Sequence, residues 1–266
     1  GAEKTFDQYL CGQPGTRAVQ VNNMGYRQAE SMPVAPTSGS NVFLTLDRSI
    51  QESAMKALEK GLNISGAKAG AAIVMRVNNG NITAMVSAPV FDPNQFTPGI
   101  SHSLWNHYLT NRPSALLFRA TQERYPPGSI FKIISGLAAL ENGLDPAKHI
   151  QCRGSYLIGR RTINCTVKPI PHKHDFKRAF KHSCNSYFIH HAVTNKHGIK
   201  HIIKMGKQFH LGKRTGLLPE QETAGQFPSL NDISRGWSDG DTANISFGQG
   251  PVSVTPLQMA LMTATV

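Results

Sequence analysis

With 266 residues, of which 39% are hydrophobic, the chain is long enough for one large domain, or for one domain and a piece of another. No run of eighteen apolar residues occurs, which excludes a transmembrane helix within this sequence, and four cysteines are too few for a disulfide scaffold. The net charge of +12 suits an anionic membrane or cell-wall surface; because the basic residues are scattered and accompany no nucleic-acid motif, we do not expect nucleic acid as a partner.

The first predicted elements surround a domain boundary. Pro and Gly punctuate residues 1–40, which we interpret as irregular strands and a linker at the end of a preceding domain. Residues 41–47, NVFLTLD, predict a short strand, and Asp47 can cap a helix that ends at Gly61. Two apolar runs on either side of NNGN then predict a hairpin over residues 70–89.

Helices dominate the rest of the chain, after a loop-like stretch from Phe91 to Tyr125. The segment PPGSIFKIISGLAALENG predicts a helix that is buried on most sides and stops at Gly143. The segments DFKRAFKH and NSYFIHHAVTNKHG predict two further helices joined by a loop. A last helix begins after Thr255 with Pro256 in its first turn, and the chain stops inside it, so we expect this sequence to be a fragment.

Ser129 and Lys132 stand three residues apart at the start of the predicted buried helix, and therefore on one face of it. A serine hydroxyl becomes a good nucleophile when a base removes its proton, and an apolar setting lowers the pKa of a lysine toward that task. The pattern alone also fits a capping serine followed by a lysine that reaches solvent. A second pair, Ser183 and Asn185, lies downstream on a predicted interhelical loop, where a hydroxyl and an amide could meet the first pair.

The phrases YPPGSIFKI, SCNSYF and GQGPVSVTPLQMA resemble the penicillin-binding transpeptidases, and in particular the class B, elongation-type branch typified by penicillin-binding protein 2. The phrases GAEKTFDQYLCGQPG, LTLDRSIQ, NITAMVSAPVFDPNQF and AALENG extend the resemblance over nearly the whole chain. It implies an α/β (α+β) fold of the penicillin-recognising serine transpeptidases, with a helical subdomain and an incomplete antiparallel sheet. Residues 1–40 would end an N-terminal pedestal, and residues 41–266 would form a truncated transpeptidase domain.

The resemblance also implies a role for each residue of the two pairs. Ser129 would be the acylated nucleophile and Lys132 its general base, Ser183 would relay a proton to the leaving amine, and Asn185 would hold the lysine and the substrate amide. In the implied reaction, a peptidoglycan stem peptide ending in D-Ala-D-Ala acylates the serine, D-Ala leaves, and the amine of a neighbouring strand takes the acyl group. β-Lactams would trap the same serine, and the acyl transfer would need no cofactor.

The family's third motif, Lys-Thr/Ser-Gly, is not found in this sequence. KRTG at 213–216 resembles it superficially, but the family's TG-hydrophobic-x-x-PxE phrase matches TGLLPEQE at this place, so the third motif would lie beyond Val266. Since that strand supplies one amide of the oxyanion hole, we expect the 266 residues alone not to react with a fluorescent penicillin.

Three cysteines and a histidine-containing segment surround the second pair. Cys152 and Cys165 flank a predicted hairpin, and Cys184 stands between the serine and the asparagine. Three thiols and an imidazole match a Cys₃His zinc site in ligand type, although the spacing is not that of a zinc finger. A Cys152–Cys165 disulfide with a packed Cys184 is an alternative in an oxidising periplasm, and three plain thiols are another.

Some elongation-type members carry a zinc site beside the active site. By resemblance, the ligands of one structural Zn²⁺ would here be Cys152, Cys165, His172 and Cys184. The family's HG after the hairpin reads HK here, so His174 is a rival for His172. The metal would fix the loop of the second pair and take no part in the chemistry.

Two other functions compete with transpeptidation, namely a β-lactam sensor domain that is acylated without turnover and a catalytically incomplete scaffold homologue. Sensors usually carry an apolar residue where Asn185 stands, and the four intact polar residues argue against a scaffold. The resemblance further implies a missing upstream membrane helix, a place in the cytoplasmic (inner) membrane with the catalytic domain facing the periplasm, and a SEDS-type glycan polymerase of the elongation complex as partner.

Overall fold

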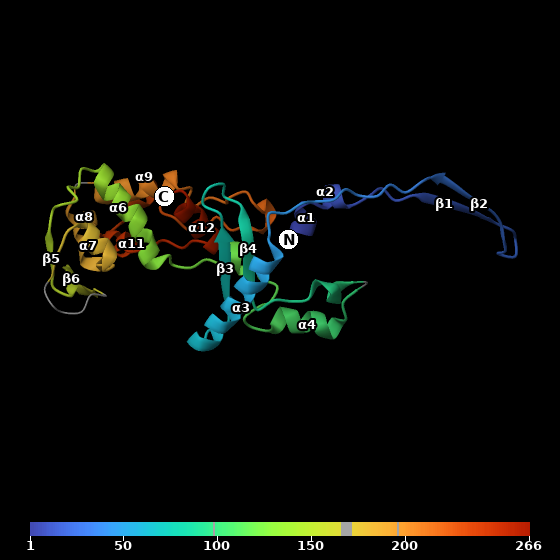
Figure 1. Ribbon diagram of the computed structural model, residues 1–266, viewed down its shortest axis with the longest axis horizontal. Coiled ribbons are helices and arrows are strands. Elements are labelled where there is room, and N and C mark those ends of the chain that lie inside the picture. Colours follow the sequence, from blue (N-terminus) through green and yellow to red (C-terminus); the bar gives the residue numbers. More distant parts are fainter. Residues whose placement is uncertain (98, 166–171, 196) are drawn as a thin grey trace. The chain divides into compact units, whose positions relative to one another are not determined.

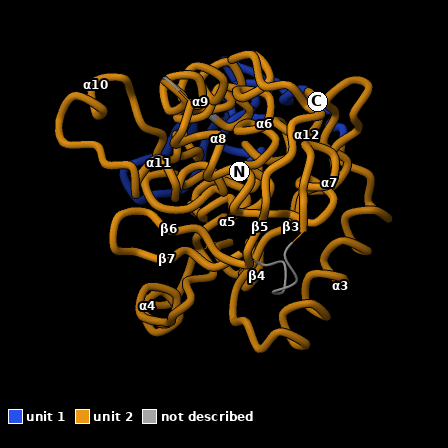
Figure 2. Tube along the Cα trace, turned by 90° about the vertical axis from the view of Figure 1, so that its left-hand side faces the viewer, with its two compact units in different colours: residues 1–45 blue, residues 46–266 orange. Residues whose placement is uncertain are grey.

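The structure is a computed structural model that describes residues 1–97, 99–165, 172–195 and 197–266. These residues form two compact units, 1–45 and 46–266 (Figure 2). The first unit contains two single-turn helices and an antiparallel hairpin, namely α1 (Ala2–Thr5), α2 (Asp7–Leu10), β1 (Thr16–Val21) and β2 (Arg27–Val34). All residues of both strands are exposed, so the hairpin is held by its backbone ladder and builds no core of its own.

The strand predicted for residues 41–47 is wrong. These residues have no regular secondary structure, and the side chains of Phe43, Leu44 and Leu46 are exposed. A short apolar run favours a strand only where a neighbouring strand can complete the ladder of hydrogen bonds, and that condition cannot be read from a local pattern.

The second unit begins with α3 (Arg48–Ser65), which packs on an antiparallel pair formed by β3 (Gly70–Met75) and β4 (Ile82–Ala88) (Figure 1). The predicted hairpin is confirmed by the β3–β4 pair. The predicted cap is also confirmed, since the Asp47 carboxylate accepts hydrogen bonds from two amides of the first turn.

The predicted end of α3 at Gly61 is wrong. The helix continues to Ser65 and ends at Gly66, whose φ of 69° is the left-handed conformation that favours glycine. Leu58 and Leu62, one turn apart, lie against Gly70 of β3, so the helix must extend past Gly61 to make this contact. Packing thus outweighs the cost of about 1 kcal/mol for a glycine inside a helix.

Residues 91–125, predicted to be a loop, contain three short helical segments, namely η1 (Pro93–Phe96), α4 (His102–Thr110) and α5 (Arg119–Gln122). Ser101 caps α4, because its hydroxyl accepts a hydrogen bond from the Leu104 amide. Sequence reasoning missed this helix, because the prolines at positions 93, 98 and 113 favour a loop.

Helices α6 (Lys132–Glu141), α8 (Asn185–Thr194), α9 (Gly198–Gln208) and α11 (Asp239–Ser246) form the helical part of this unit, at the end of the view in Figure 1 where they are labelled, whereas α12 (Pro256–Ala264) packs on β3. α6 packs against α8 and α9, and α8 packs against α11. As predicted, α6 is largely buried, with Phe131 before it and Ile134 and Ala138 within it inaccessible to solvent. The segments are η2 (Gly128–Phe131), α6 (Lys132–Glu141), α7 (Phe176–Lys181), α8 (Asn185–Thr194), α9 (Gly198–Gln208), η3 (Pro219–Gln221), α10 (Leu230–Ile233), α11 (Asp239–Ser246) and α12 (Pro256–Ala264).

Two small antiparallel pairs complete the unit. β6 (Ser155–Ile158) and β7 (Arg161–Asn164) form the predicted hairpin between the two cysteines, and β5 (Ile150–Cys152) pairs with β8 (His172–His174). Within the described ranges, no helix is both long and apolar enough to cross a membrane.

Candidate active site

Ser129 lies in a tight turn that leads into α6. The turn is the 3₁₀ segment η2, and its first residue, Gly128, has a φ of 59° and donates its amide to the carbonyl of Gly248 at 2.9 Å. A side chain at Gly248 would overlap the backbone of Gly128, so the glycine-rich FGQG loop is what lets the two backbones meet. Ser129 is exposed, so its hydroxyl can be reached from solvent.

Lys132, the first residue of α6, lies at the centre of a hydrogen-bond network. Its Nζ is 3.1 Å from Ser129 Oγ, 2.8 Å from both the Oγ and the carbonyl oxygen of Ser183, and 2.7 Å from Asn185 Oδ1. Ser183 Oγ in turn donates to Ser129 Oγ at 2.8 Å. The structure therefore brings together all four residues of the two predicted pairs.

Burial changes the protonation of Lys132. The side chain is 1% exposed, and desolvation lowers its pKa from 10.5 to about 8, while the nearby thiols of Cys165 and Cys184 oppose the shift. At pH 7, about one lysine in ten is then neutral, against about one in 3,000 with the ordinary pKa. An amine that is neutral this often and within reach of a serine hydroxyl can act as a general base.

Ser183 is held in an uncommon backbone conformation. Its φ of 51° is in the left-handed region, where a residue with a Cβ is strained. Backbone bonds from its amide to the carbonyl of Phe180, and from the Cys184 amide to the carbonyl of Ala179, hold the end of α7 in this shape. In this conformation both the hydroxyl and the carbonyl of Ser183 point toward Lys132.

Asn185 connects the site to the β6–β7 hairpin. It is the first residue of α8, where the predicted helix NSYFIHHAVTNKHG also begins, and not part of the loop that carries Ser183. Its buried amide donates from Nδ2 to the carbonyl of Asn164 at 3.2 Å, while its Oδ1 accepts from Lys132. The amide orientation is therefore fixed on both sides. Nothing local in the sequence pointed to Asn164, because its contribution is a backbone carbonyl.

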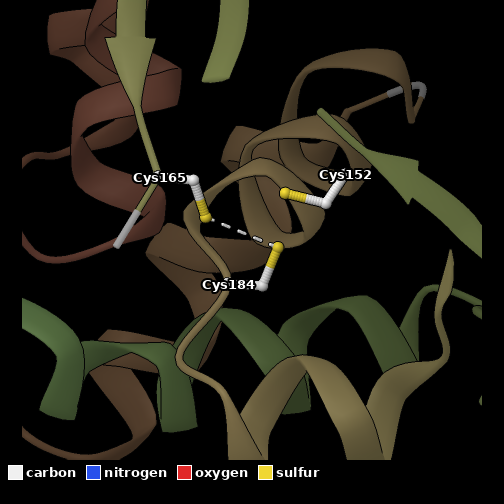
Figure 3. Close-up of side chains that lie close together, drawn as sticks. All are labelled: Cys152, Cys165 and Cys184. Carbon is white, nitrogen blue, oxygen red and sulfur yellow. Dashed lines mark hydrogen bonds between the residues drawn. The ribbon is translucent and has the colours of Figure 1, made fainter. Parts of the chain in front are cut away.

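Three thiols meet directly behind the second pair (Figure 3). Cys152 ends β5, Cys165 follows β7 and Cys184 precedes α8, and their sulfur atoms all lie within 4.8 Å of one another. All three are free thiols, so the structure contains no Cys152–Cys165 disulfide. Contact with Cys165, followed by burial, strongly raises the pKa of Cys184, so without a cation this thiol stays protonated.

The two candidate histidines differ in their surroundings. In the β5–β8 register His172 is opposite Cys152 and His174 is opposite Ile150. The His172 side chain is exposed, whereas His174 is 2% exposed and neither of its ring nitrogens has a hydrogen-bond partner among the described residues. Neither histidine has a ring nitrogen within 4.8 Å of all three sulfur atoms.

The donor set fits a zinc ion. Thiolates are strong zinc ligands, and zinc–sulfur bonds of about 2.3 Å place the corners of a tetrahedron about 3.8 Å apart. Cys165 Sγ and Cys184 Sγ are 3.7 Å apart. A buried imidazole such as that of His174, which lacks a partner among the described residues, is the kind of group that a fourth coordination position would satisfy, although its nitrogens lie outside the 4.8 Å group of thiols.

Comparison with known families identifies most of this unit. Residues 70–266 match the family described as the penicillin binding protein transpeptidase domain. The peptidoglycan D,D-transpeptidase MrdA of Acinetobacter baumannii is 30% identical over 274 residues, an alignment that covers 99% of this chain and 39% of that protein. The chain thus spans about 40% of the length of the curated relatives it matches.

Solved structures give the same result for the fold. A peptidoglycan synthase complex that coordinates polymerization and crosslinking contains a chain with a TM-score of 0.86 and 32% identity, over 99% of this chain and 48% of that one. The penicillin-binding protein 2 of Helicobacter pylori, solved in complex with MreC, has a TM-score of 0.82 and 28% identity, over 97% and 48%. The predicted α/β fold with a helical subdomain is confirmed.

Proposed function

Because the chain belongs to the penicillin-binding protein transpeptidase family, and to its elongation-type class B branch as its motifs predicted, we propose that the whole protein is a peptidoglycan D,D-transpeptidase that acts in cell elongation and shape. The observation that carries the proposal is the position of Lys132 Nζ, within 3.1 Å of Ser129 Oγ and bonded to Ser183 and Asn185. This is the arrangement that an activated serine needs.

Acylation begins at Ser129. Its Oγ attacks the carbonyl carbon of the penultimate D-Ala of a stem peptide, and its proton passes to the neutral amine of Lys132. When the tetrahedral intermediate breaks down, the bond to the terminal D-Ala is cleaved and the leaving nitrogen must gain a proton. Ser183 Oγ, at 2.8 Å from both Lys132 Nζ and Ser129 Oγ, is placed to pass that proton on.

Deacylation reverses the roles. The amine of a neighbouring stem peptide attacks the acyl carbon and loses a proton, and Ser129 Oγ regains one as the ester bond breaks. Asn185 keeps Lys132 in place during both steps, because its Oδ1 is fixed by the contact of its own Nδ2 with Asn164. In a β-lactam, attack by Ser129 opens the ring, and the leaving nitrogen stays tethered, so the acyl-enzyme accumulates.

The test uses the full-length protein with lipid-linked or polymeric peptidoglycan substrate. The proposal expects release of D-Ala together with cross-linked stem peptides, and loss of both in Ser129→Ala. Acylation by penicillin without cross-linking would identify a β-lactam sensor instead. Neither acylation nor cross-linking would identify a catalytically incomplete scaffold homologue.

A structural Zn²⁺ is the second part of the proposal. Its ligands would be Cys152, Cys165, Cys184 and one histidine. Of the two candidates, burial and two ring nitrogens without a partner among the described residues support His174, although the family pattern pointed to His172. When bound, the metal supplies a fixed anchor between Ser183 and Asn185 and leaves acyl transfer to the side chains.

The partners and location of the whole protein follow from the family. We place it in the cytoplasmic (inner) membrane through a helix outside this sequence, with the transpeptidase domain on the periplasmic side. A SEDS-type glycan polymerase and other proteins of the elongation complex are the proposed partners. The similarity to chains of a peptidoglycan synthase complex and of a complex with MreC supports this assignment.

A further inference from the structure

A small cavity lies behind the proposed active site, between the two helices that begin at Lys132 and Asn185. Its volume is about 10 Å³, counted as the space open to the centre of a water molecule, which is close to the least that one water needs. Ser135 and Asn142, from α6 and its C-terminal cap, line it on one side, and Tyr187 and His191, from α8, line it on the other.

The helical spacing explains why these four side chains meet. Ser135 and Asn142 are seven residues apart, which is about two turns of helix, and Tyr187 and His191 are four residues apart, which is about one turn. Each pair therefore projects from one face of its helix, and α6 and α8 are in contact. The rings of Tyr187 and His191 pack at a centroid distance of 4.5 Å.

All four side chains carry a buried polar atom that lacks a partner among the described residues. These atoms are Ser135 Oγ, Asn142 Nδ2, Tyr187 Oη and His191 Nε2, and none has a hydrogen bond to any residue that the structure describes. The serine, tyrosine and histidine are 4%, 1% and 9% exposed. Buried polar groups of folded proteins almost always have a hydrogen-bond partner, so four such residues around one cavity point to a partner that binds in it.

The chemistry of the four groups suits water. The two hydroxyls can each donate and accept, and the amide nitrogen donates. Burial lowers the pKa of His191 to about 4, so its imidazole is neutral at physiological pH, with one donor and one acceptor nitrogen. The cavity therefore presents donors and acceptors without a net charge, which does not favour an ion.

We propose that this cavity binds one ordered water molecule, which joins polar groups of α6 to polar groups of α8 and so holds Lys132 against Asn185. Ser135 lies one turn after Lys132, and Tyr187 lies within one turn of Asn185. A link between Ser135 and Tyr187 therefore fixes the starts of the two helices, where Lys132 Nζ and Asn185 Oδ1 are 2.7 Å apart. Ser135, Asn142, Tyr187 and His191 are positioning residues, because they act through the two helices and touch no reacting atom.

The first test is an experimental structure of the full-length protein at a resolution that shows ordered water. We expect density for a water molecule within hydrogen-bonding distance of at least one polar atom from each helix. A dry cavity, or direct hydrogen bonds among the four side chains, would overturn the proposal. This readout does not depend on the proposed enzymatic activity.

The second test uses Ser135→Ala and Tyr187→Phe, each of which removes one hydroxyl with little change in size. With a bound water, each substitution should lower the free energy of unfolding. The effect of the double variant should differ from the sum of the two single effects by the equivalent of about a threefold or larger change in the unfolding equilibrium constant. Ser186→Ala is the matched control, since its hydroxyl is also 2% exposed and unpartnered among the described residues but does not line the cavity. Removing that hydroxyl should leave stability unchanged or raise it.

The positioning role rests on the proposed function and has its own readout. Ser135→Ala and Tyr187→Phe should slow acylation by penicillin severalfold, without weakening the initial binding of penicillin and without moving the pH at which the rate changes. Additive, stabilising effects of the two substitutions would contradict the bound water. An unchanged acylation rate would contradict the positioning role. A wild-type protein that is never acylated would contradict the proposed function. The experimental density and the stabilities of the single and double variants would still show whether the cavity holds a water molecule.

Discussion

Lys132 Nζ lies 2.7 Å from Asn185 Oδ1, although 53 residues separate them in the sequence. The contact joins the first residue of α6 to the first residue of α8, so each helix fixes the start of the other. Ser129 on one side and Ser183 on the other are both within hydrogen-bonding distance of the same nitrogen. The four proposed catalytic residues thus depend on the packing of two helices.

Replacing Lys132 with methionine should remove most of the acylation rate. Methionine keeps the buried volume but cannot take a proton, and the loss of a positioned general base reduces a rate by about 10²–10⁴-fold. Stopped-flow measurement with a fluorescent penicillin on the full-length protein checks this. Lys204→Met, an exposed lysine on α9, is the control and should react as the wild type does. A similar reduction in both variants would remove the assignment of Lys132 as base.

The acylation rate should rise with pH and level off above about pH 8. Only neutral Lys132 accepts a proton, and burial lowers its pKa to about 8, so the reactive fraction grows about tenfold per pH unit below that value. The rate constant at saturating penicillin, measured across the pH range in which the protein stays folded, gives the profile. A flat profile, or a midpoint near the ordinary lysine pKa, would show that this amine is not the base.

Gly248→Ala should disturb the nucleophile without touching it. A Cβ at this position would overlap the carbonyl oxygen of Gly128, and the φ of 77° is unfavourable for alanine, so we expect a loss of about 1–3 kcal/mol in stability and a slower acylation of Ser129. Gly66→Ala is the control, because its φ is 69° but no atom lies within 4 Å of the added carbon. It should cost stability alone, and equal acylation rates in the two variants would contradict the account of the turn.

The purified protein should contain about one zinc ion per chain, held in part by Cys184. Cys184→Ser should lose the metal, lower the melting temperature and slow acylation, because the residue between Ser183 and Asn185 loses its anchor. Cys11→Ser is the control, since Cys11 is exposed and outside the thiol cluster. Metal analysis and intact mass distinguish a bound zinc ion from a disulfide. Absence of zinc together with a mass lower by two hydrogens in a Cys152–Cys165 peptide would establish the disulfide instead.

His174→Ala should weaken zinc binding more than His172→Ala does. The His174 ring is buried with both nitrogens unpartnered among the described residues, whereas the His172 ring is exposed. Competition with a chromophoric chelator measures both affinities, and removal of a direct ligand should cost more than the roughly 10–100-fold lost with an outer-shell partner. The reverse order would restore His172 as the ligand.

The residues that the sequence predicted well are those whose role depends on a local pattern. Asp47 and Thr255 cap helices because their own side chains reach amides of the next turn, and such a signal is complete within a few residues. The proposed catalytic residues were identified for another reason, namely that the family phrases carry them. Their meeting around one amine depends on the packing of α6 against α8, which no local pattern contains.

The features that were missed or wrong depend on distant neighbours. α3 passes Gly61 because Leu58 and Leu62 pack at Gly70, and residues 41–47 do not form a strand despite their apolar side chains. The role of Gly248 depends on an approach to Gly128, more than a hundred residues earlier. For the histidines, resemblance pointed to His172, and only burial in the folded chain separates it from His174.

The central claim is that Ser129 is the nucleophile activated by Lys132. Peptide mapping by mass spectrometry, after the full-length protein has reacted with penicillin, tests it most directly. The account predicts one penicilloyl adduct, located on Ser129, and no adduct in a folded Ser129→Ala variant. An adduct on another residue, or undiminished labelling of Ser129→Ala, would contradict it.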